Sequence, residues 1–175
     1  MKKLLIILSA VVLIVSCKSA HDKMIDKIDA TDKLMMADTL MKDDSLASQQ
    51  YNTLSEFALK FPKDEKTPVY LLKSADLASR LKRTMQAFLI YKKVNEDFPN
   101  TKQGADGMFM MAFLYENNFK NNDKAKEYYT LFINKYPDHP FVKDAKASLD
   151  MLNSGKTIED MVKEWEAKTD STAKK

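Results

Sequence analysis

Two short patterns in the sequence have the residue types of catalytic motifs. Ser79-x-x-Lys82 places a lysine close to a serine that could act as a nucleophile. The Lys-Thr-Gly tripeptide that accompanies this pattern in serine-acylating enzymes is absent from the sequence, and Ser79 stands at a predicted helix end. The Gly-Lys-Thr run at 155–157 ends like a phosphate-binding loop, but Asp150 occupies the position of that loop's first glycine. Neither pattern indicates catalysis.

Metal and acid–base chemistry also have few candidate residues. The chain has two histidines, His21 and His139, and 25 acidic residues. A zinc site would have to be built around carboxylates. A carboxylate pair for glycoside hydrolysis could be chosen in many ways, and nothing singles one out. We expect His139 to be a polar turn residue, and the sequence predicts no metal, no cofactor and no enzyme activity.

The single cysteine, Cys17, stands at the end of a signal-like segment. Residues 1–3 are Met-Lys-Lys and residues 4–15 are apolar, which is typical of a secretory signal peptide. The apolar run is too short for a transmembrane helix, which needs about 20 residues. The junction Ile-Val-Ser-Cys at 14–17 resembles the bacterial lipobox, in which the cysteine becomes the lipid-bearing N-terminus of the mature protein. We therefore expect lipidation at Cys17.

The residue after the cysteine bears on the membrane that the chain would reach. It is Lys18 rather than the Asp that typically retains such lipoproteins in the inner membrane, so we expect an outer-membrane anchor facing the periplasm. An ordinary cleavage site near Ala20 is the alternative, although it would put Lys18 where a small residue is wanted. With Cys17 acylated, no cysteine is left for a disulfide or a thiolate metal site.

Composition favours one all-α domain. The 28 basic and 25 acidic residues give a net charge of +3, too balanced for an electrostatic clamp on nucleic acid. The apolar fraction of 45% argues against disorder. Three glycines and five prolines are too few for a turn-rich β-sandwich or barrel.

An internal repeat supports helices. Aromatic–proline pairs end at Pro62, Pro99 and Pro137, and the prolines should end helices because they exclude the helical conformation for the preceding residue. Positions five, eight and twelve before each proline then share one helix face. These positions hold Phe57, Leu54 and Gln50 in the first unit, Val94, Tyr91 and Ala87 in the second, and Phe132, Tyr129 and Ala125 in the third.

The third unit resembles a tetratricopeptide repeat. Ala125, Tyr129, Phe132 and Pro137 have the small, aromatic, apolar and proline spacing of its second helix, and the run 108–115 resembles its first helix. The Tyr-Pro-Asp-His-Pro run at 136–140 is similar to the Tyr-Pro-Asp-Ser-Pro turn of periplasmic tetratricopeptide-repeat lipoproteins and proteins of the BamD and CpoB type. The resemblance implies an all-α solenoid of about three helix–turn–helix units with a C-terminal capping helix.

We expect a signal peptide at 1–16, a lipidated cysteine and tether at 17–30, a repeat domain at 31–168 and a flexible tail at 169–175. The repeat units span about 31–62, 68–99 and 103–137, and the cap spans 140–168. The last helix of the cap presents Ile158, Met161, Val162 and Trp165 on one face.

Local signals support these boundaries. Thr67 and Pro68 predict an N-cap and a first-turn proline, and Gly155 predicts a helix stop. Gly104 and Gly107 predict close helix packing.

In repeats of this kind the first helix of each unit lines the inner surface of the array, which is where a partner binds. The resemblance therefore implies a partner-binding groove formed by Val69, Leu72, Asp76, Ser79, Asp106, Phe109, Phe113 and Glu116. Two phenylalanines one turn apart with acids at either end would suit an extended or helical peptide. The alternative is that the helix around Trp165 folds back and covers Phe109 and Phe113.

We expect a membrane-anchored periplasmic scaffold that binds an envelope protein or peptide, in outer-membrane protein assembly or envelope integrity. The alternative is a glycan-binding or cell-wall-associated lipoprotein or hydrolase. An apolar groove favours the first, and exposed aromatic platforms near a carboxylate cleft favour the second.

Overall fold

The computed structural model describes residues 18–37, 44–155, 160, 162–163 and 166, and within these ranges it contains helices and no strand. The helices are α1 (Ala20–Ala37), α2 (Asp44–Lys60), α3 (Thr67–Arg80), α4 (Thr84–Asp97), α5 (Lys102–Asn117), α6 (Asn122–Lys135) and α7 (Val142–Ser154).

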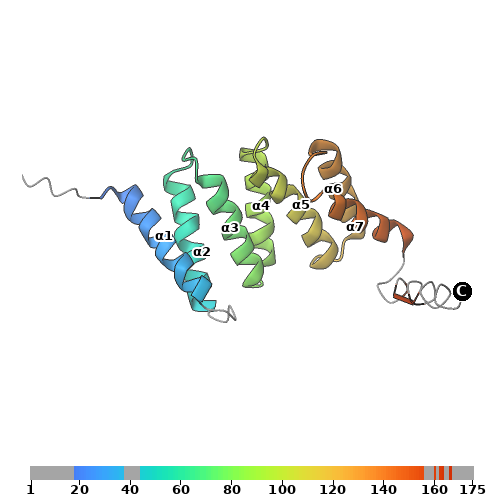
Figure 1. Cartoon of the computed structure of the whole chain (residues 1–175), viewed down its shortest axis with the longest axis horizontal. Coiled ribbons are helices and arrows are strands. Elements are labelled where there is room, and N and C mark those ends of the chain that lie inside the picture. Colours follow the sequence, from blue (N-terminus) through green and yellow to red (C-terminus); the bar gives the residue numbers. More distant parts are fainter. Residues whose placement is uncertain (1–17, 38–43, 156–159, 161, 164–165, 167–175) are drawn as a thin grey trace, which may run out of the picture.

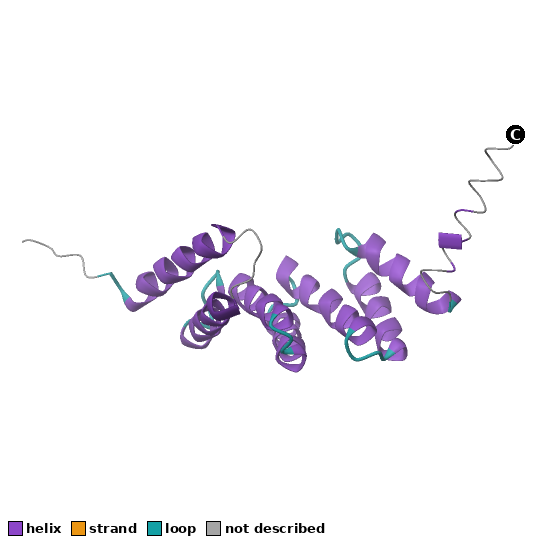
Figure 2. Cartoon of the chain, turned by 90° about the horizontal axis from the view of Figure 1, so that it is seen from below, coloured by secondary structure: helices purple, strands orange, loops and turns teal. Residues whose placement is uncertain are grey.

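The helices form a single row in which each packs against the next (Figure 1). Successive helices run up and down, and α3 also contacts α5. Seen from below, the row is curved, because α1 and α7 lie on the same side of the middle helices (Figure 2). This arrangement confirms the predicted all-α repeat solenoid.

The three aromatic–proline pairs end helices as predicted. Helices α2, α4 and α6 each end two residues before the proline. The aromatic residue of each pair donates its backbone N–H to the carbonyl four residues earlier, which closes the last turn. The proline cannot extend that hydrogen-bond ladder because it lacks an N–H.

The predicted stripe forms the core. All nine of its side chains are fully buried, at 0% exposure. Eight are apolar or aromatic and one, Gln50, is polar. Its Nε2 donates to the Ile28 carbonyl at 3.0 Å and to Asp32 Oδ1 at 2.9 Å, so this amide links α2 to α1. These two bonds satisfy the donor side of the amide, whereas its Oε1 is buried without a hydrogen-bond partner among the described residues.

Two glycines let α5 approach α4 closely, as predicted. A Cβ on Gly104 would lie 2.1 Å from the carbonyl oxygen of Phe98, and a Cβ on Gly107 would lie 2.7 Å from that of Tyr91. Both obstacles are backbone atoms, which cannot move aside as a side chain can. These positions therefore require glycine for packing.

Helix starts match the sequence in part. Pro68 lies in the first turn of α3, as predicted, but the N-cap residue is Lys66 and Thr67 does not cap the helix. Thr67 Oγ1 instead donates to the Phe61 carbonyl at 2.6 Å, so this hydroxyl stabilises the preceding loop. The helix stop at Gly155 is confirmed, with φ of 64° in the left-handed region that favours glycine.

The prediction of a tether up to residue 30 is wrong. Residues from Ala20 onward belong to α1, and Ile28 is completely buried against Leu54, Phe57 and Tyr70. The segment is polar overall, but a helix with one neighbour needs only a narrow apolar stripe. Leu34, further along α1, is exposed.

The start of α1 is joined to the loop after α2 through His21. Its Nε2 lies 2.8 Å from Asp64 Oδ2, and its ring packs against Phe57 and Phe61 at centroid distances of 5.4 and 4.9 Å. The hydrogen bond to Asp64, followed by one to Asp22, raises the pKa of His21. The histidine thus holds α1 to the array more firmly when it is protonated.

We expect the contribution of His21 to stability to depend on pH. Because its folded pKa is raised, the contribution is fully present below the unfolded pKa, about 6.5, and is lost as pH rises through the folded pKa. His21→Gln should therefore lower the melting temperature more at pH 5.5 than at pH 8.5. Equal losses at both pH values would contradict an electrostatic role and leave only the ring packing.

Several predicted segments lie outside the described residues. These are the signal peptide with Cys17, the tail, and the part of the cap that holds Ile158, Met161 and Trp165. Coverage of the predicted groove by the Trp165 helix lies outside them as well. Within the described part of the chain, no helix combines the length and apolar character needed to span a bilayer.

Candidate partner-binding surface

The eight residues of the predicted groove lie on α3 and α5, two helices in direct contact. The structure does not expose them equally. Val69, Asp76 and Phe113 are exposed, Leu72, Ser79, Phe109 and Glu116 are half-buried, and Asp106 is buried.

Phe109 does not serve as an open anchor for a partner. Its ring lies 4.9 Å from that of Phe141, 5.5 Å from Phe132 and 5.8 Å from Tyr129, measured between centroids. The side chain therefore packs between α5, α6 and the start of α7. Phe113, one turn further along α5, is 40% exposed and remains available for contact.

Asp106 joins α5 to the loop between α6 and α7. Lys102 Nζ lies 2.8 Å from its Oδ2, and His139 Nε2 lies 3.3 Å from its Oδ1. The Asp106 and His139 side chains are each 8% exposed. Burial lowers the pKa of His139, and the charge of Asp106 opposes this, so the environment favours the neutral imidazole. We therefore correct the assignment of Asp106 to the groove, because its carboxylate is used within the fold.

Two carboxylates of the predicted groove are held by buried tyrosines. Tyr91 Oη donates to Asp76 Oδ1 at 2.6 Å, and Tyr129 Oη donates to Glu116 Oε2 at 2.7 Å. Burial raises the pKa of both tyrosines, which keeps them protonated as donors. Although the Asp76 residue is exposed overall, desolvation of its carboxyl group raises its pKa; the hydrogen bond from Tyr91 opposes this rise and the charge of Asp106 adds to it. The second helix of each unit thus fixes an acid on the first.

A pocket that the sequence did not reveal lies between α1 and α3. It has a volume of about 230 Å³ and is lined by Asp32, Met35, Met36, Leu54, Lys73, Asp76 and Leu77. Its walls are mostly apolar, and at its rim Lys73 Nζ pairs with Asp32 Oδ2 at 2.7 Å. The α1 residues that line it, Asp32, Met35 and Met36, fall within the predicted first repeat unit, but nothing in the sequence indicated that they would meet α3.

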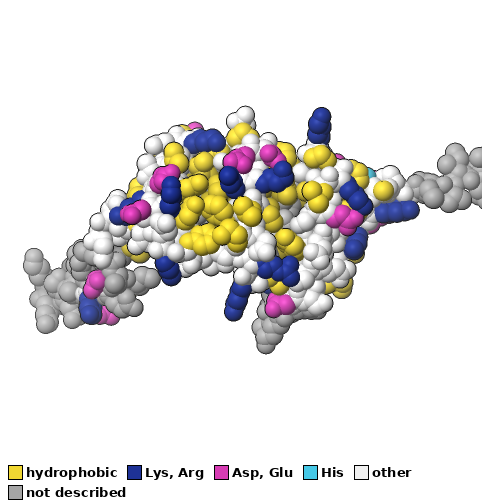
Figure 3. All heavy atoms as spheres, turned by 180° about the vertical axis from the view of Figure 1, so that it is seen from behind, with side chains coloured by type: hydrophobic (Ala, Val, Ile, Leu, Met, Phe, Trp, Pro, Cys, Tyr) yellow, Lys and Arg dark blue, Asp and Glu magenta, His cyan; other side chains and the backbone are white. Residues whose placement is uncertain are grey.

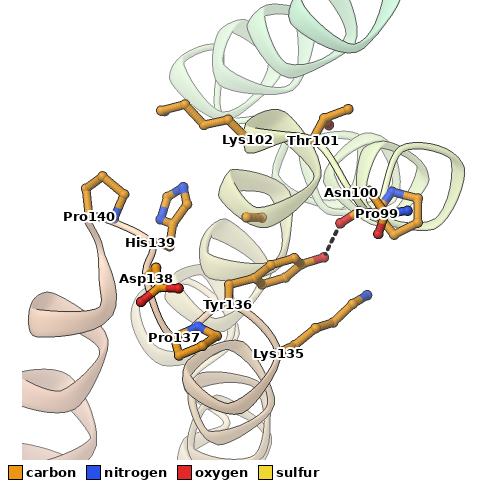
Figure 4. Close-up of a pocket in the computed structure, with 11 residues that line it drawn as sticks. Pro99, Asn100, Thr101, Lys102, Lys135, Tyr136, Pro137, Asp138, His139 and Pro140 are labelled. Carbon is orange, nitrogen blue, oxygen red and sulfur yellow. Dashed lines mark hydrogen bonds between the residues drawn. The ribbon is translucent and has the colours of Figure 1, made fainter.

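A larger hollow, of about 470 Å³, lies between the proline loops that follow α4 and α6 (Figure 4). Tyr136 points across it, and its hydroxyl donates to the Pro99 carbonyl at 2.9 Å and accepts from Asn95 Nδ2 at 2.9 Å. Asn95 Nδ2 also donates to the Gly104 carbonyl at 2.8 Å. These bonds join successive loops, which is a structural role.

Apolar side chains also gather on the surface across the middle of the array, with charged groups around them (Figure 3). The middle helices expose large apolar residues on each of α3 to α6. These are Val69, Met85, Leu89, Phe113 and Leu131. Val69 and Phe113 belong to the first helices of the repeats, where exposed apolar side chains are typical of a surface that contacts other molecules. Met85, Leu89 and Leu131 belong to α4 and α6, outside the predicted groove.

The Ser79-x-x-Lys82 pattern lies at the end of α3, where the Lys82 backbone N–H donates to the Ser79 carbonyl at 2.9 Å. Ser79 is half-buried near the end of α3, and Lys82 lies beyond that helix with a φ of 59°. In the described part of the chain, no three side chains among the histidines, cysteines and acids are grouped so that they could hold a metal ion.

Comparison with known families agrees with this geometry. Two stretches, residues 70–101 and 106–139, match the family model of the tetratricopeptide repeat. The chain carries two tetratricopeptide repeats. The first repeat covers most of α3 and α4, and the second covers most of α5 and α6. A comparison with curated proteins gives no match.

The candidate residues lie on the helices that form the inner surface of a tetratricopeptide-repeat array. Arrays of stacked helix pairs form extended concave surfaces that bind partners. The first helices of the two repeats, α3 and α5, carry the candidate residues, and α1 precedes them on the same side of the row. Tetratricopeptide repeats generally mediate binding to other proteins, so the two repeats indicate a protein-interaction scaffold.

Proposed function

We propose that the chain is a lipid-anchored scaffold on the periplasmic side of the outer membrane, which binds a protein or peptide of the cell envelope. The observation that supports binding is the inner face of two tetratricopeptide repeats, where Phe113 is exposed on α5 and Asp76 is exposed at the α1–α3 pocket. The observation that supports anchoring is the lipobox-like sequence that ends at Cys17.

An anchor at Cys17 suits this function. Two or more acyl chains give stable membrane attachment where one chain is marginal. The array begins at Ala20, three residues after the cysteine, so α1 would lie close to the bilayer surface. A partner in outer-membrane protein assembly or envelope integrity would be met at that surface. Catalysis has no part in the proposal.

The test is mild cross-linking of the tagged chain in its own cells, followed by membrane fractionation and mass spectrometry. Wild-type chain should sediment with outer membranes, incorporate labelled palmitate and recover envelope proteins. Cys17→Ser should lose both label and sedimentation. Phe113→Ser, on the inner face, should lose the partner but keep the anchor.

The matched control is Leu131→Ser on α6, which is 47% exposed compared with 40% for Phe113. Equal partner recovery from the wild type and both serine variants would indicate that the partner binds another face of the array. Recovery of wall fragments or glycans in place of proteins would favour a glycan-binding or wall-associated lipoprotein. A Cys17→Ser chain that still sediments with membranes would refute the anchor.

A further inference from the structure

The pocket between α1 and α3 offers a partner a site for an apolar side chain. Met35 and Met36 on α1 face Leu77 on α3, and Leu54 of α2 contributes to the lining. Methionine side chains are flexible and polarisable, so they adapt to different apolar groups. Met36 is 79% exposed, so its side chain is accessible to a partner that enters the pocket.

The charges around this pocket are unevenly matched. On the inner side of α1, α3 and α5, two lysines are already used in ion pairs, Lys73 with Asp32 and Lys102 with Asp106. Among the described residues, no lysine, arginine or histidine pairs with Asp76 or Glu116. Asp76 and Glu116 are therefore two carboxylates of the inner face that have no ionic partner among the described residues.

These two carboxylates are held in position before any partner arrives. Each accepts a short hydrogen bond from a fully buried tyrosine, Tyr91 for Asp76 and Tyr129 for Glu116. Side chains that are already ordered lose less conformational entropy on binding. A negative charge covered by a partner also needs a cation to offset its desolvation, and guanidinium or ammonium groups supply it.

We propose that the inner face binds a partner segment in which lysine or arginine residues flank a large apolar residue. The apolar side chain enters the α1–α3 pocket, one basic group pairs with Asp76 at its rim, and another pairs with Glu116 on α5. This inference rests on the scaffold function proposed above and specifies the chemistry of its partner.

The inference can be tested by selecting random 12-residue peptides on phage against the full chain in detergent. The enriched sequences should combine Lys or Arg with Leu, Ile, Met or Phe. Binding of the strongest peptide, labelled with fluorescein, is then measured by fluorescence anisotropy. Asp76→Asn and Glu116→Gln should each weaken it about tenfold, as expected for loss of a charged hydrogen bond.

Both amide substitutions retain an oxygen that can accept from the tyrosine, so the fold should survive. Leu77→Ser should also weaken binding about tenfold by making the pocket polar. The controls are Glu96→Gln on α4, an exposed acid paired with Lys92 at 3.6 Å, and Leu131→Ser; both should bind like wild type. Thermal melting of every variant separates lost binding from lost folding.

Two results would overturn the inference and leave the scaffold function intact. One is enrichment of acidic or purely apolar peptides, and the other is binding that Asp76→Asn and Glu116→Gln do not change. If no peptide is enriched, the inference is wrong. If cross-linking in cells also recovers no protein, the scaffold function fails with it.

Discussion

Gly104→Ala should lower the free energy of unfolding by about 3 kcal/mol, at the upper end of the range for overpacked sites. The added methyl group would overlap the carbonyl oxygen of Phe98, 2.1 Å away, and the contact could be relieved only by moving α5 away from α4. Urea denaturation followed by circular dichroism would measure the loss. A loss of stability would be informative in itself, because replacing glycine by alanine inside a helix normally stabilises the helix by about 1 kcal/mol.

Gly107→Ala and Gly155→Ala are matched controls for this prediction. Gly107 would meet the Tyr91 carbonyl at 2.7 Å, so we expect a smaller loss, about 2 kcal/mol. Gly155 has open space around it but a φ of 64°, so its cost of about 1 kcal/mol comes from backbone strain alone. A neutral or stabilising Gly104→Ala would show that α4 and α5 are not packed as described.

Phe109→Ala should destabilise the chain by about 3 kcal/mol, whereas Phe113→Ala should change its stability by less than about 0.5 kcal/mol. The first ring packs against Tyr129, Phe132 and Phe141, and its removal leaves a cavity where α5, α6 and α7 meet. The second ring is substantially exposed. Denaturation of the two variants under one set of conditions measures the difference.

For partner recovery we expect the opposite order of the two alanine variants. Phe113→Ala should reduce it directly while the fold remains intact, whereas any loss in Phe109→Ala should follow the fraction of unfolded chain. If the two variants were equally stable, the Phe109 ring would not be needed for packing, and it would again be a candidate for partner contact. A double substitution of both residues could not separate these effects, and single variants are needed.

The core could be predicted from the sequence because its signal is periodic. The same apolar spacing recurs three times, each time with a proline after the helix, so the burial of the nine stripe positions follows from the sequence. The close approach of α5 to α4 was also predictable, from Gly104 and Gly107. In both cases the residue types alone carry the constraint.

The N-terminal helix was harder to predict because its signal depends on its neighbour. Residues 18–30 are polar, and Ile28 becomes a core residue only when α2 supplies the opposing surface. The α1–α3 pocket could not be predicted for the same reason. It requires Met35 and Leu77 to face each other across two helices that are 30 residues or more apart in sequence.

The groove residues show a different limit of prediction from the sequence. Spacing placed Phe109 and Phe113 on related faces of α5, but one helical turn separates a packed ring from an exposed one. The difference comes from Phe141 at the start of α7, which reaches Phe109 at 4.9 Å. Likewise, Asp106 is buried by Lys102 and His139, and only one of these two residues lies on its own helix.

The position of α1 as the first helix of the row connects partner binding to local folding. Among the described residues, α1 packs mainly against α2, and a helix with one main neighbour separates from an array more readily than a helix packed on both sides. One wall of the α1–α3 pocket exists only while α1 is docked, and the apparent affinity of the pocket is scaled by the docked fraction. By linkage, a bound partner stabilises the docked state in return. Changes at a distance, such as loss of the contact between His21 and Asp64, would then alter affinity by shifting a conformational population while every residue that touches the partner stays the same.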